Sequence, residues 1–211
     1  MKCYSIDNEK LLPRIANHLI INSSFIENLG LFHGKMGIVI FFLHYYKHSG
    51  KKIYLNFANE LIEEIYDETH AEIPVNLESG IVGIGWGLKY LIKDGILSKD
   101  HYRVLKEIDR KIMERDLKRI TDFSLRTGFE GISLYLNQSI QISKQYRLKL
   151  HFDKDYLSTW KTITNEDVKY DDNKILISLI SSGEPKGEDI TQWPLGLERG
   201  CAGKGLKFLL S

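Results

Sequence analysis

The chain contains little cysteine: among its 211 residues only Cys3 and Cys201 are present. Two cysteines cannot make a disulfide framework, and they cannot by themselves supply a thiolate zinc site. The longest strongly apolar run, residues 36–43, is far shorter than the roughly 20 residues of a membrane span, and residues 1–7 lack the apolar stretch of a secretory signal. We therefore expect reduced thiols and a cytoplasmic protein.

The chain also lacks an excess of charge of either sign. Its 29 basic and 28 acidic residues leave a formal net charge of +1, so no overall field draws it to nucleic acid or to an anionic membrane. We expect neither as a partner. A hydrophobic content of 43% with 27% charged residues is typical of a folded globular protein.

One pattern, Leu-x-x-Gly-x-x-Gly, occurs four times, and we call it the signature. It lies at residues 31–37, 77–83, 125–131 and 197–203. The first glycines, at positions 34, 80, 128 and 200, are 46, 48 and 72 residues apart, which places about 25 extra residues within 151–193. The spacing predicts a single domain over residues 1–211, built of about four repeats, with an insertion around 151–193.

Each repeat is expected to be a helical hairpin. Apolar stretches follow the signatures at residues 38–43, 84–91, 132–136 and 206–210, and these predict buried inner helices. Amphipathic segments precede the first three signatures, with apolar residues at helical spacing within 12–19, 57–65 and 104–112, and these predict outer helices. Charged runs at residues 109–111 and 114–116 are typical of a solvated face. The chain is therefore predicted to be all-α, with about eight helices.

Two glycines three residues apart at the start of a buried helix let a neighbouring backbone approach closely, and the first can also adopt a positive φ. A phosphate-binding loop is the other chemistry that glycine-rich turns support. No strand is predicted before the signatures, and no Lys-Ser or Lys-Thr follows the glycines. We therefore interpret the glycines as structural.

Residues 30–38, 80–88 and 200–206 resemble the starts of the inner helices in the lanthionine synthetase C-like family. The resemblance implies an α/α toroid of paired helices whose inner helices begin near a central cavity. It also implies a relation to cyclases that close thioether rings on dehydrated precursor peptides. Four hairpins make only an incomplete ring of this kind.

The family cyclases hold a catalytic zinc with two cysteines and one histidine, in the patterns Cys-His-Gly and Trp-Cys-x-Gly. Here Phe32 precedes His33 and Gly34, Arg126 lies two residues before Gly128, and Glu198 and Arg199 precede Gly200. A guanidinium group stays protonated and has no lone pair for a metal. Cys201 falls inside the Gly-x-x-Gly, where it is expected to be a small buried side chain. The resemblance thus implies a zinc site whose ligands are not matched, and we expect no metal and no other cofactor.

Arg126 and Arg199 are predicted to lie beside inner-helix N-termini, where positive potential would favour an anion. Pairing of these arginines with Glu130 or Glu198 inside the protein is the other interpretation. Glu78 and Trp86 are further candidates for ligand binding. The candidates for catalysis are His33, Glu130 and Glu198.

The sequence favours a protein related to lanthionine biosynthesis that binds or matures a peptide without zinc-dependent cyclase activity, and it leaves open whether the protein is an enzyme. One alternative is a carbohydrate-active toroid enzyme that uses paired carboxylates from Glu78, Glu130 and Glu198. Another is a scaffold that grips a protein through an aromatic-rich concave surface. The residues of this aromatic-rich concave surface would be Phe32, Trp86, Tyr90, Trp193 and Phe208, of which Phe32 and Trp193 lie outside the predicted inner helices. The partners to consider are a peptide substrate, a partner protein and a second copy of the chain.

Overall fold

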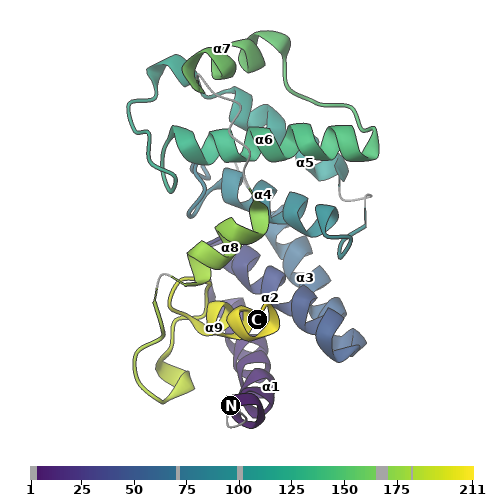
Figure 1. Cartoon of the computed structure of the whole chain (residues 1–211), viewed down its shortest axis with the longest axis vertical. Helices are drawn as coiled ribbons and strands as arrows, with labels where there is room; N and C mark the ends of the chain where they lie inside the picture. Colours follow the sequence, from purple (N-terminus) through teal and green to yellow (C-terminus); the bar gives the residue numbers. More distant parts are fainter. Residues whose placement is uncertain (1–3, 70–71, 99–101, 165–170, 182) are drawn as a thin grey trace. The chain divides into compact units, whose positions relative to one another are not determined.

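The computed structural model describes residues 4–69, 72–98, 102–164, 171–181 and 183–211. Within these ranges the chain forms nine α-helices and short 3₁₀ helices, with no β-strand (Figure 1). The all-α class predicted from the sequence is confirmed. None of the helices in the described part of the chain is long and apolar enough to cross a membrane.

The helices belong to two compact units, which we describe separately. Unit 1 joins Met1–His70 to Asn173–Ser211, and unit 2 is the intervening segment Ala71–Asp172. Unit 1 contains α1 (Tyr4–Asn22), η1 (Ser23–Phe25), α2 (Lys35–Ser49), α3 (Lys52–Glu68), η4 (Ile190–Gln192) and α9 (Cys201–Leu209). Unit 2 contains α4 (Ile81–Lys93), α5 (Tyr102–Met113), η3 (Leu117–Arg119), α6 (Phe129–Tyr146) and α7 (Lys154–Thr164). Helix α8 (Asp172–Ile180) starts at the last residue of unit 2, and the expected insertion carries α7, α8 and η4.

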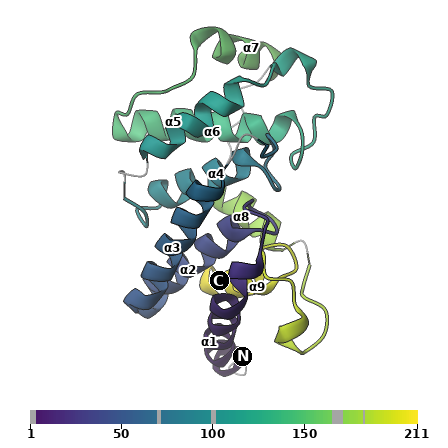
Figure 2. The same ribbon diagram turned by 180° about the vertical axis from the view of Figure 1, so that it is seen from behind.

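In unit 1, α2 packs against α3 and α9, and α1 packs against α9 (Figures 1 and 2). Every residue of α2 from Lys35 to Tyr45 is buried, as expected for an inner helix that is apolar on all sides. Helix α3 buries one face only, at Tyr54, Ala58, Leu61, Ile62 and Ile65, which is the outer-helix pattern that the sequence predicted. The turn between them is made by Gly50, whose φ of 70° ends α2.

In unit 2, α4 packs against α5 and α6, and α7 packs against η3. The residues of α4 from Ile81 to Ile92 are buried, although Lys89 is among them. Helix α5 is strongly amphipathic, with Leu105, Ile108 and Ile112 on its buried side. The predicted alternation of inner and outer helices is therefore present in both units.

The first glycine of every signature precedes the inner helix and lies against the chain's own loop. Its φ is −115° at Gly34, −109° at Gly80, −112° at Gly128 and −126° at Gly200, so the positive φ allowed by our sequence interpretation is not used. A Cβ added at Gly80 would lie 2.0 Å from the carbonyl oxygen of Pro74, and one at Gly128 would lie 2.2 Å from that of Asp122. Close approach of backbone, not backbone conformation, therefore requires glycine here.

The same loop carbonyls accept the first free N–H groups of the inner helices, which would otherwise lack partners. The residue after each first glycine donates to the carbonyl seven positions earlier. These bonds are Lys35 N to Asn28 O at 2.9 Å, Ile81 N to Pro74 O at 2.9 Å, Phe129 N to Asp122 O at 2.8 Å, and Cys201 N to Pro194 O at 2.7 Å. Further bonds follow from Met36, Gly83, Ala202 and Gly203 to the next loop carbonyls. The helix start and the loop before it thus form one hydrogen-bonded structure.

The second glycine meets the carbonyl of the leucine that opens the signature. A Cβ would lie 2.4 Å from Leu31 O at Gly37, 2.4 Å from Leu125 O at Gly131 and 1.8 Å from Leu197 O at Gly203. Leucine and glycine at this spacing therefore bring the loop against the first turn of the helix. The close contact that the sequence predicted is present, and the partner at these three glycines includes the protein's own preceding loop.

We predict that Gly203→Ala destabilises unit 1 by on the order of 1–3 kcal/mol or more, because backbone must move to admit the methyl group. Thermal unfolding followed by circular dichroism measures the effect. Gly50→Asn is the matched control, since nothing lies within 4 Å of a Cβ at Gly50 and asparagine tolerates its positive φ. Equal melting temperatures for the Gly203→Ala variant and the unaltered chain would contradict the proposed role of the close contact.

Candidate functional site

Signatures dock on one another in pairs within each unit. In unit 1 the backbone N–H groups of Leu197 and Glu198 donate to the carbonyl of Phe32, at 2.8 and 3.1 Å. In unit 2 the N–H groups of Leu77 and Glu78 donate in the same way to the carbonyl of Arg126, at 3.0 and 3.1 Å. Phe32 and Arg126 occupy the same position of their signatures. This repeated bond pair fixes which side chains of two distant signatures meet.

In unit 1 the docking brings His33 to Glu198. The imidazole Nε2 of His33 lies 3.2 Å from a carboxylate oxygen of Glu198, and their side chains are 45% and 15% exposed. The ring of Phe32 lies beside that of His33, with 6.3 Å between centroids. A largely covered carboxylate next to a half-exposed imidazole can orient the imidazole ring. Two of the three sequence candidates for catalysis thus lie together.

In unit 2 the equivalent pair is Glu78 with Arg126. A guanidinium nitrogen of Arg126 lies 3.1 Å from a carboxylate oxygen of Glu78, and their side chains are 42% and 22% exposed. The sequence did not predict this pairing, because it offered Glu130 and Glu198 as internal partners for the arginines. It was missed because signatures 48 residues apart had to be matched in register, and nothing in one signature shows which other it docks on.

Arg126 and Arg199 were expected to lie beside inner-helix N-termini, and backbone of the preceding loops lies against these helix starts. Loop carbonyls accept the N–H groups of Phe129 in α6 and of Cys201, Ala202 and Gly203 in α9. Arg199 is exposed and has a φ of 50°.

The remaining candidates lie elsewhere. Glu130 is exposed in the first turn of α6. Trp86, which we had expected to bind a ligand, is fully buried in α4 and stacks on Tyr90 with 5.6 Å between ring centroids. Because its side chain is fully buried, it offers no surface to a ligand in this structure. Its role here is packing in the core.

At the positions that correspond to the family's zinc ligands, the chain carries other residues. Arg126 stands where the family has the cysteine of Trp-Cys-x-Gly, and Glu198 and Arg199 stand where it has the cysteine and histidine of Cys-His-Gly. At the other comparable pair, His33 and Gly34, Phe32 stands in place of the cysteine. The thiol of Cys201 is fully buried, and burial raises its pKa to about 12, which disfavours the thiolate that zinc needs. The donor set does not fit a site of two cysteines and one histidine.

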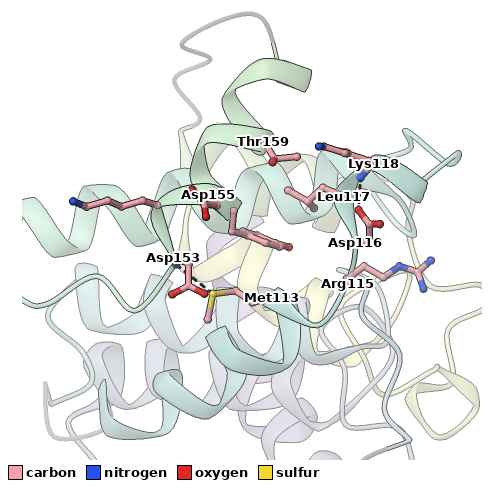
Figure 3. Close-up of a pocket in the computed structure, with 10 residues that line it drawn as sticks. Met113, Arg115, Asp116, Leu117, Lys118, Asp153, Asp155 and Thr159 are labelled. Carbon is pink, nitrogen blue, oxygen red and sulfur yellow. Dashed lines mark hydrogen bonds between the residues drawn. The ribbon is translucent and has the colours of Figure 1, made fainter.

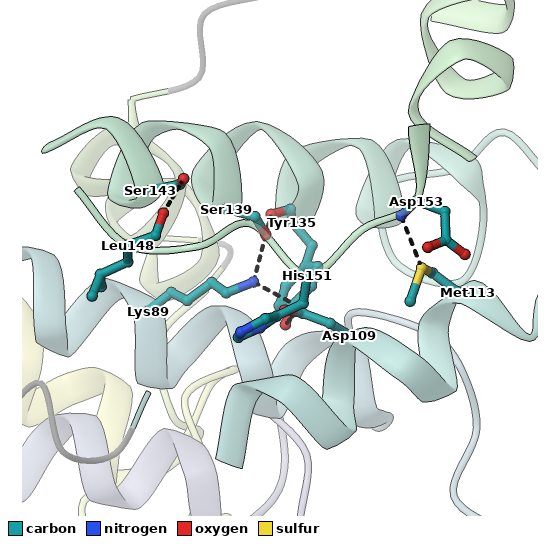
Figure 4. A network of polar contacts seen from close by, with 9 residues as sticks. All are labelled: Lys89, Asp109, Met113, Tyr135, Ser139, Ser143, Leu148, His151 and Asp153. Atoms are coloured by element: carbon teal, nitrogen blue, oxygen red, sulfur yellow. Dashed lines mark hydrogen bonds and ion pairs between the residues drawn. The ribbon is translucent and has the colours of Figure 1, made fainter. Parts of the chain in front are cut away.

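A second polar cluster lies in the interior of unit 2, around Lys89 (Figure 4). The ammonium of Lys89 donates to Asp109 at 3.1 Å and to the hydroxyl of Ser139, and it lies 3.4 Å from the centroid of the Tyr135 ring. Asp109 also accepts from the hydroxyl of Tyr135 at 2.6 Å, and Nδ1 of His151 lies 3.1 Å from its second oxygen. Our interpretation of residues 109–111 as a solvated face was wrong for Asp109, which is 1% exposed.

This cluster joins four parts of unit 2 through one carboxylate. Lys89 comes from α4, Asp109 from α5, Tyr135 and Ser139 from α6, and His151 from the segment before α7. Removing one partner of a buried ion pair leaves an uncompensated charge, which is strongly destabilising. A lysine in the middle of an otherwise apolar stretch, residues 81–92, was the signal in the sequence that could have revealed the cluster.

Burial lowers the pKa of Lys89 to about 8 from an ordinary value of 10.5, although Asp109 opposes the shift. Between these two values the unfolded chain binds more protons than the folded chain, so Lys89 contributes stability that rises with pH in this window. We predict that the free energy of unfolding rises between pH 8 and 9.5 relative to a Lys89→Met variant, by up to about 1 kcal/mol per pH unit. Urea unfolding of both proteins across this range measures the difference, and parallel pH profiles would refute the assignment.

The family model for lanthionine synthetase C-like proteins matches residues 25–184. The matched part contains the first three signatures, and the fourth, at 197–203, repeats their geometry beyond it. No curated protein and no solved structure matches the chain. Because the family match covers well over half of the sequence, the chain belongs to the lanthionine synthetase C-like family.

Proposed function

We propose that the chain acts in peptide modification by binding a peptide at the signature loops, without zinc-dependent ring closure. The observation that carries the proposal is the replacement of the family's ligand positions by Phe32, Arg126, Glu198 and Arg199. Ring closure needs a thiolate nucleophile, and zinc supplies it by lowering the pKa of the substrate thiol. Family membership supports a peptide as the ligand, and the altered donor set argues against that chemistry. A cytoplasmic location is part of the proposal.

The two glutamate pairs supply groups suited to a peptide. His33 and Arg126 are half exposed, and a ligand can therefore reach them, whereas Glu198 and Glu78 are more covered and hold them in place. A guanidinium carries its N–H donors in a fixed plane, a geometry that suits planar acceptor groups. Peptide carbonyls and carboxylates are acceptors that match such donors. Within each unit, the docked signatures thus present an oriented basic group.

We predict that the purified chain carries less than one equivalent of zinc and does not accelerate thioether formation. The probe is a synthetic peptide with one cysteine and one dehydroalanine, incubated with and without the chain and with added zinc sulfate. Mass-spectrometric metal analysis and thiol titration give the two readouts. One zinc per chain together with faster ring closure would overturn the absence of cyclase activity.

Peptide binding at the signatures can be tested separately from cyclase activity. A fluorescein-labelled form of the same peptide should bind the zinc-free chain, and Arg126→Ala should weaken binding by about tenfold, because hydrogen bonds to charged groups contribute about 1.5–3 kcal/mol. Arg119→Ala removes an equal charge at a position 88% exposed and outside the signatures, and it should leave the affinity unchanged. Fluorescence anisotropy measures both. Lack of binding, or equal losses in the two variants, would contradict peptide binding at the signatures.

A further inference from the structure

A pocket of about 740 Å³ opens in unit 2 between two polypeptide segments (Figure 3). One wall is the segment from the end of α5 through η3, and the other is the start of α7. The pocket shares no residue with the signatures. Its walls carry charged side chains, and Tyr156 and Thr159 also line it.

The two walls carry charges of opposite sign. The α7 wall presents Asp153, Lys154 and Asp155, which leave one net negative charge, and the α5–η3 wall presents Arg115, Asp116 and Lys118, which leave one net positive charge. Figure 3 shows Asp153 and Asp155 on one side of the pocket and Arg115 and Lys118 on the other. Clustered charges of both signs facing one hollow provide a dipolar environment.

The carboxylate of Asp116 already has partners in the α5–η3 segment. It accepts from the backbone N–H of Lys118 at 3.0 Å, which caps η3, and lies 3.3 Å from the guanidinium of Arg119. These contacts offset its negative charge locally. The field that the α5–η3 wall directs at a ligand is therefore dominated by Arg115 and Lys118.

Direct bonds tie the walls together. The hydroxyl of Tyr156 in α7 donates to the carbonyl of Ile112 in α5 at 3.0 Å, and the backbone N–H of Asp153 donates to the sulfur of Met113 at 3.4 Å. Leu117 of η3 is buried where η3 and α7 pack against each other. The two segments that carry the opposed charges are thus joined before a ligand arrives, so their backbones need not be brought together on binding.

We propose that this pocket binds a small zwitterion, with its ammonium group at Asp153 and Asp155 and its carboxylate at Arg115 and Lys118. Free amino acids and short peptides with both ends unblocked have this chemistry. A ligand with one charge satisfies one wall only, and a neutral ligand satisfies neither. Because all four charged side chains are exposed, each ion pair is weak and the dissociation constant falls in the millimolar range.

The test pairs ligand blocking with side-chain neutralisation. Diglycine, N-acetyl-diglycine and diglycine amide are titrated into the isotope-labelled chain, and amide shifts around the pocket are followed by NMR. Diglycine should bind about 3- to 10-fold more tightly than either blocked form. Glycine, triglycine and tetraglycine are the further arms, which distinguish a free amino acid from longer peptides.

Each wall has its own variant. Arg115→Ala should weaken diglycine about 3- to 10-fold and leave the affinity for diglycine amide unchanged, because that ligand has no carboxylate to lose a partner. Asp155→Asn should weaken diglycine similarly and leave N-acetyl-diglycine unchanged. Arg110→Ala and Glu107→Gln are the charge-matched controls, since both side chains are on α5 but do not line the pocket.

Two results would overturn the proposal. One is the absence of saturable binding for every probe up to its solubility limit. The other is an affinity that blocking the ends or neutralising Arg115 and Asp155 does not change, since binding would then not depend on the opposed charges. Circular dichroism of the variants checks that the fold is kept, which is expected because both side chains are exposed.

Discussion

The structure of both units depends on the hydrogen bonds between loop carbonyls and the N-termini of the inner helices. A buried helix start has N–H groups that no solvent can reach, and leaving them unpaired would cost free energy at each repeat. The signature satisfies this need with backbone from the preceding loop, and side-chain caps are absent at α2, α4, α6 and α9. Two glycines remove the Cβ atoms that would prevent the approach. The leucine, itself buried at Leu31, Leu77 and Leu197, fixes the loop on the core.

The fold was predictable because its main signals are local. Helical periodicity identified the outer faces of α3 and α5, and continuous apolar runs identified α2 and α4, as the burial of both sets confirms. The close approach at Gly37, Gly131 and Gly203 followed from the absence of a side chain. Which backbone would approach did not follow, because sequence spacing alone does not distinguish a neighbouring helix from the chain's own loop. The negative φ of the first glycine was also not predicted, because a glycine in the sequence is compatible with either sign of φ.

The candidate site was less predictable, since it depends on contacts between distant segments. His33 and Glu198 were both identified from the signatures, but 165 positions separate them, and contacts between the two segments such as the bonds to Phe32 bring them together. Asp109 was misinterpreted as part of a solvated face because Arg110 and Lys111 follow it, and three consecutive charged residues are usually solvated. A helix turns by about 100° per residue, so one of three consecutive charges can face the core. The lysine that it meets is on another helix, and no local pattern links the two.

Unit 1 is built from two segments that are far apart in the sequence, and this affects how it forms during synthesis of the chain. Helix α2 packs against α9, and the ring of Phe41 lies so close to Gly205 that an added Cβ would be 2.3 Å from it. Residues 69–200 must be translated after α3 before α9 begins, which at about 5–20 residues per second takes roughly 7–26 s. During this time the most apolar helix of the unit lacks one of its covers, while unit 2 can fold as a continuous segment. The face of α2 that α9 covers therefore stays exposed while the rest of the chain is being synthesised. A chaperone that shields apolar segments near the ribosome would act on α2.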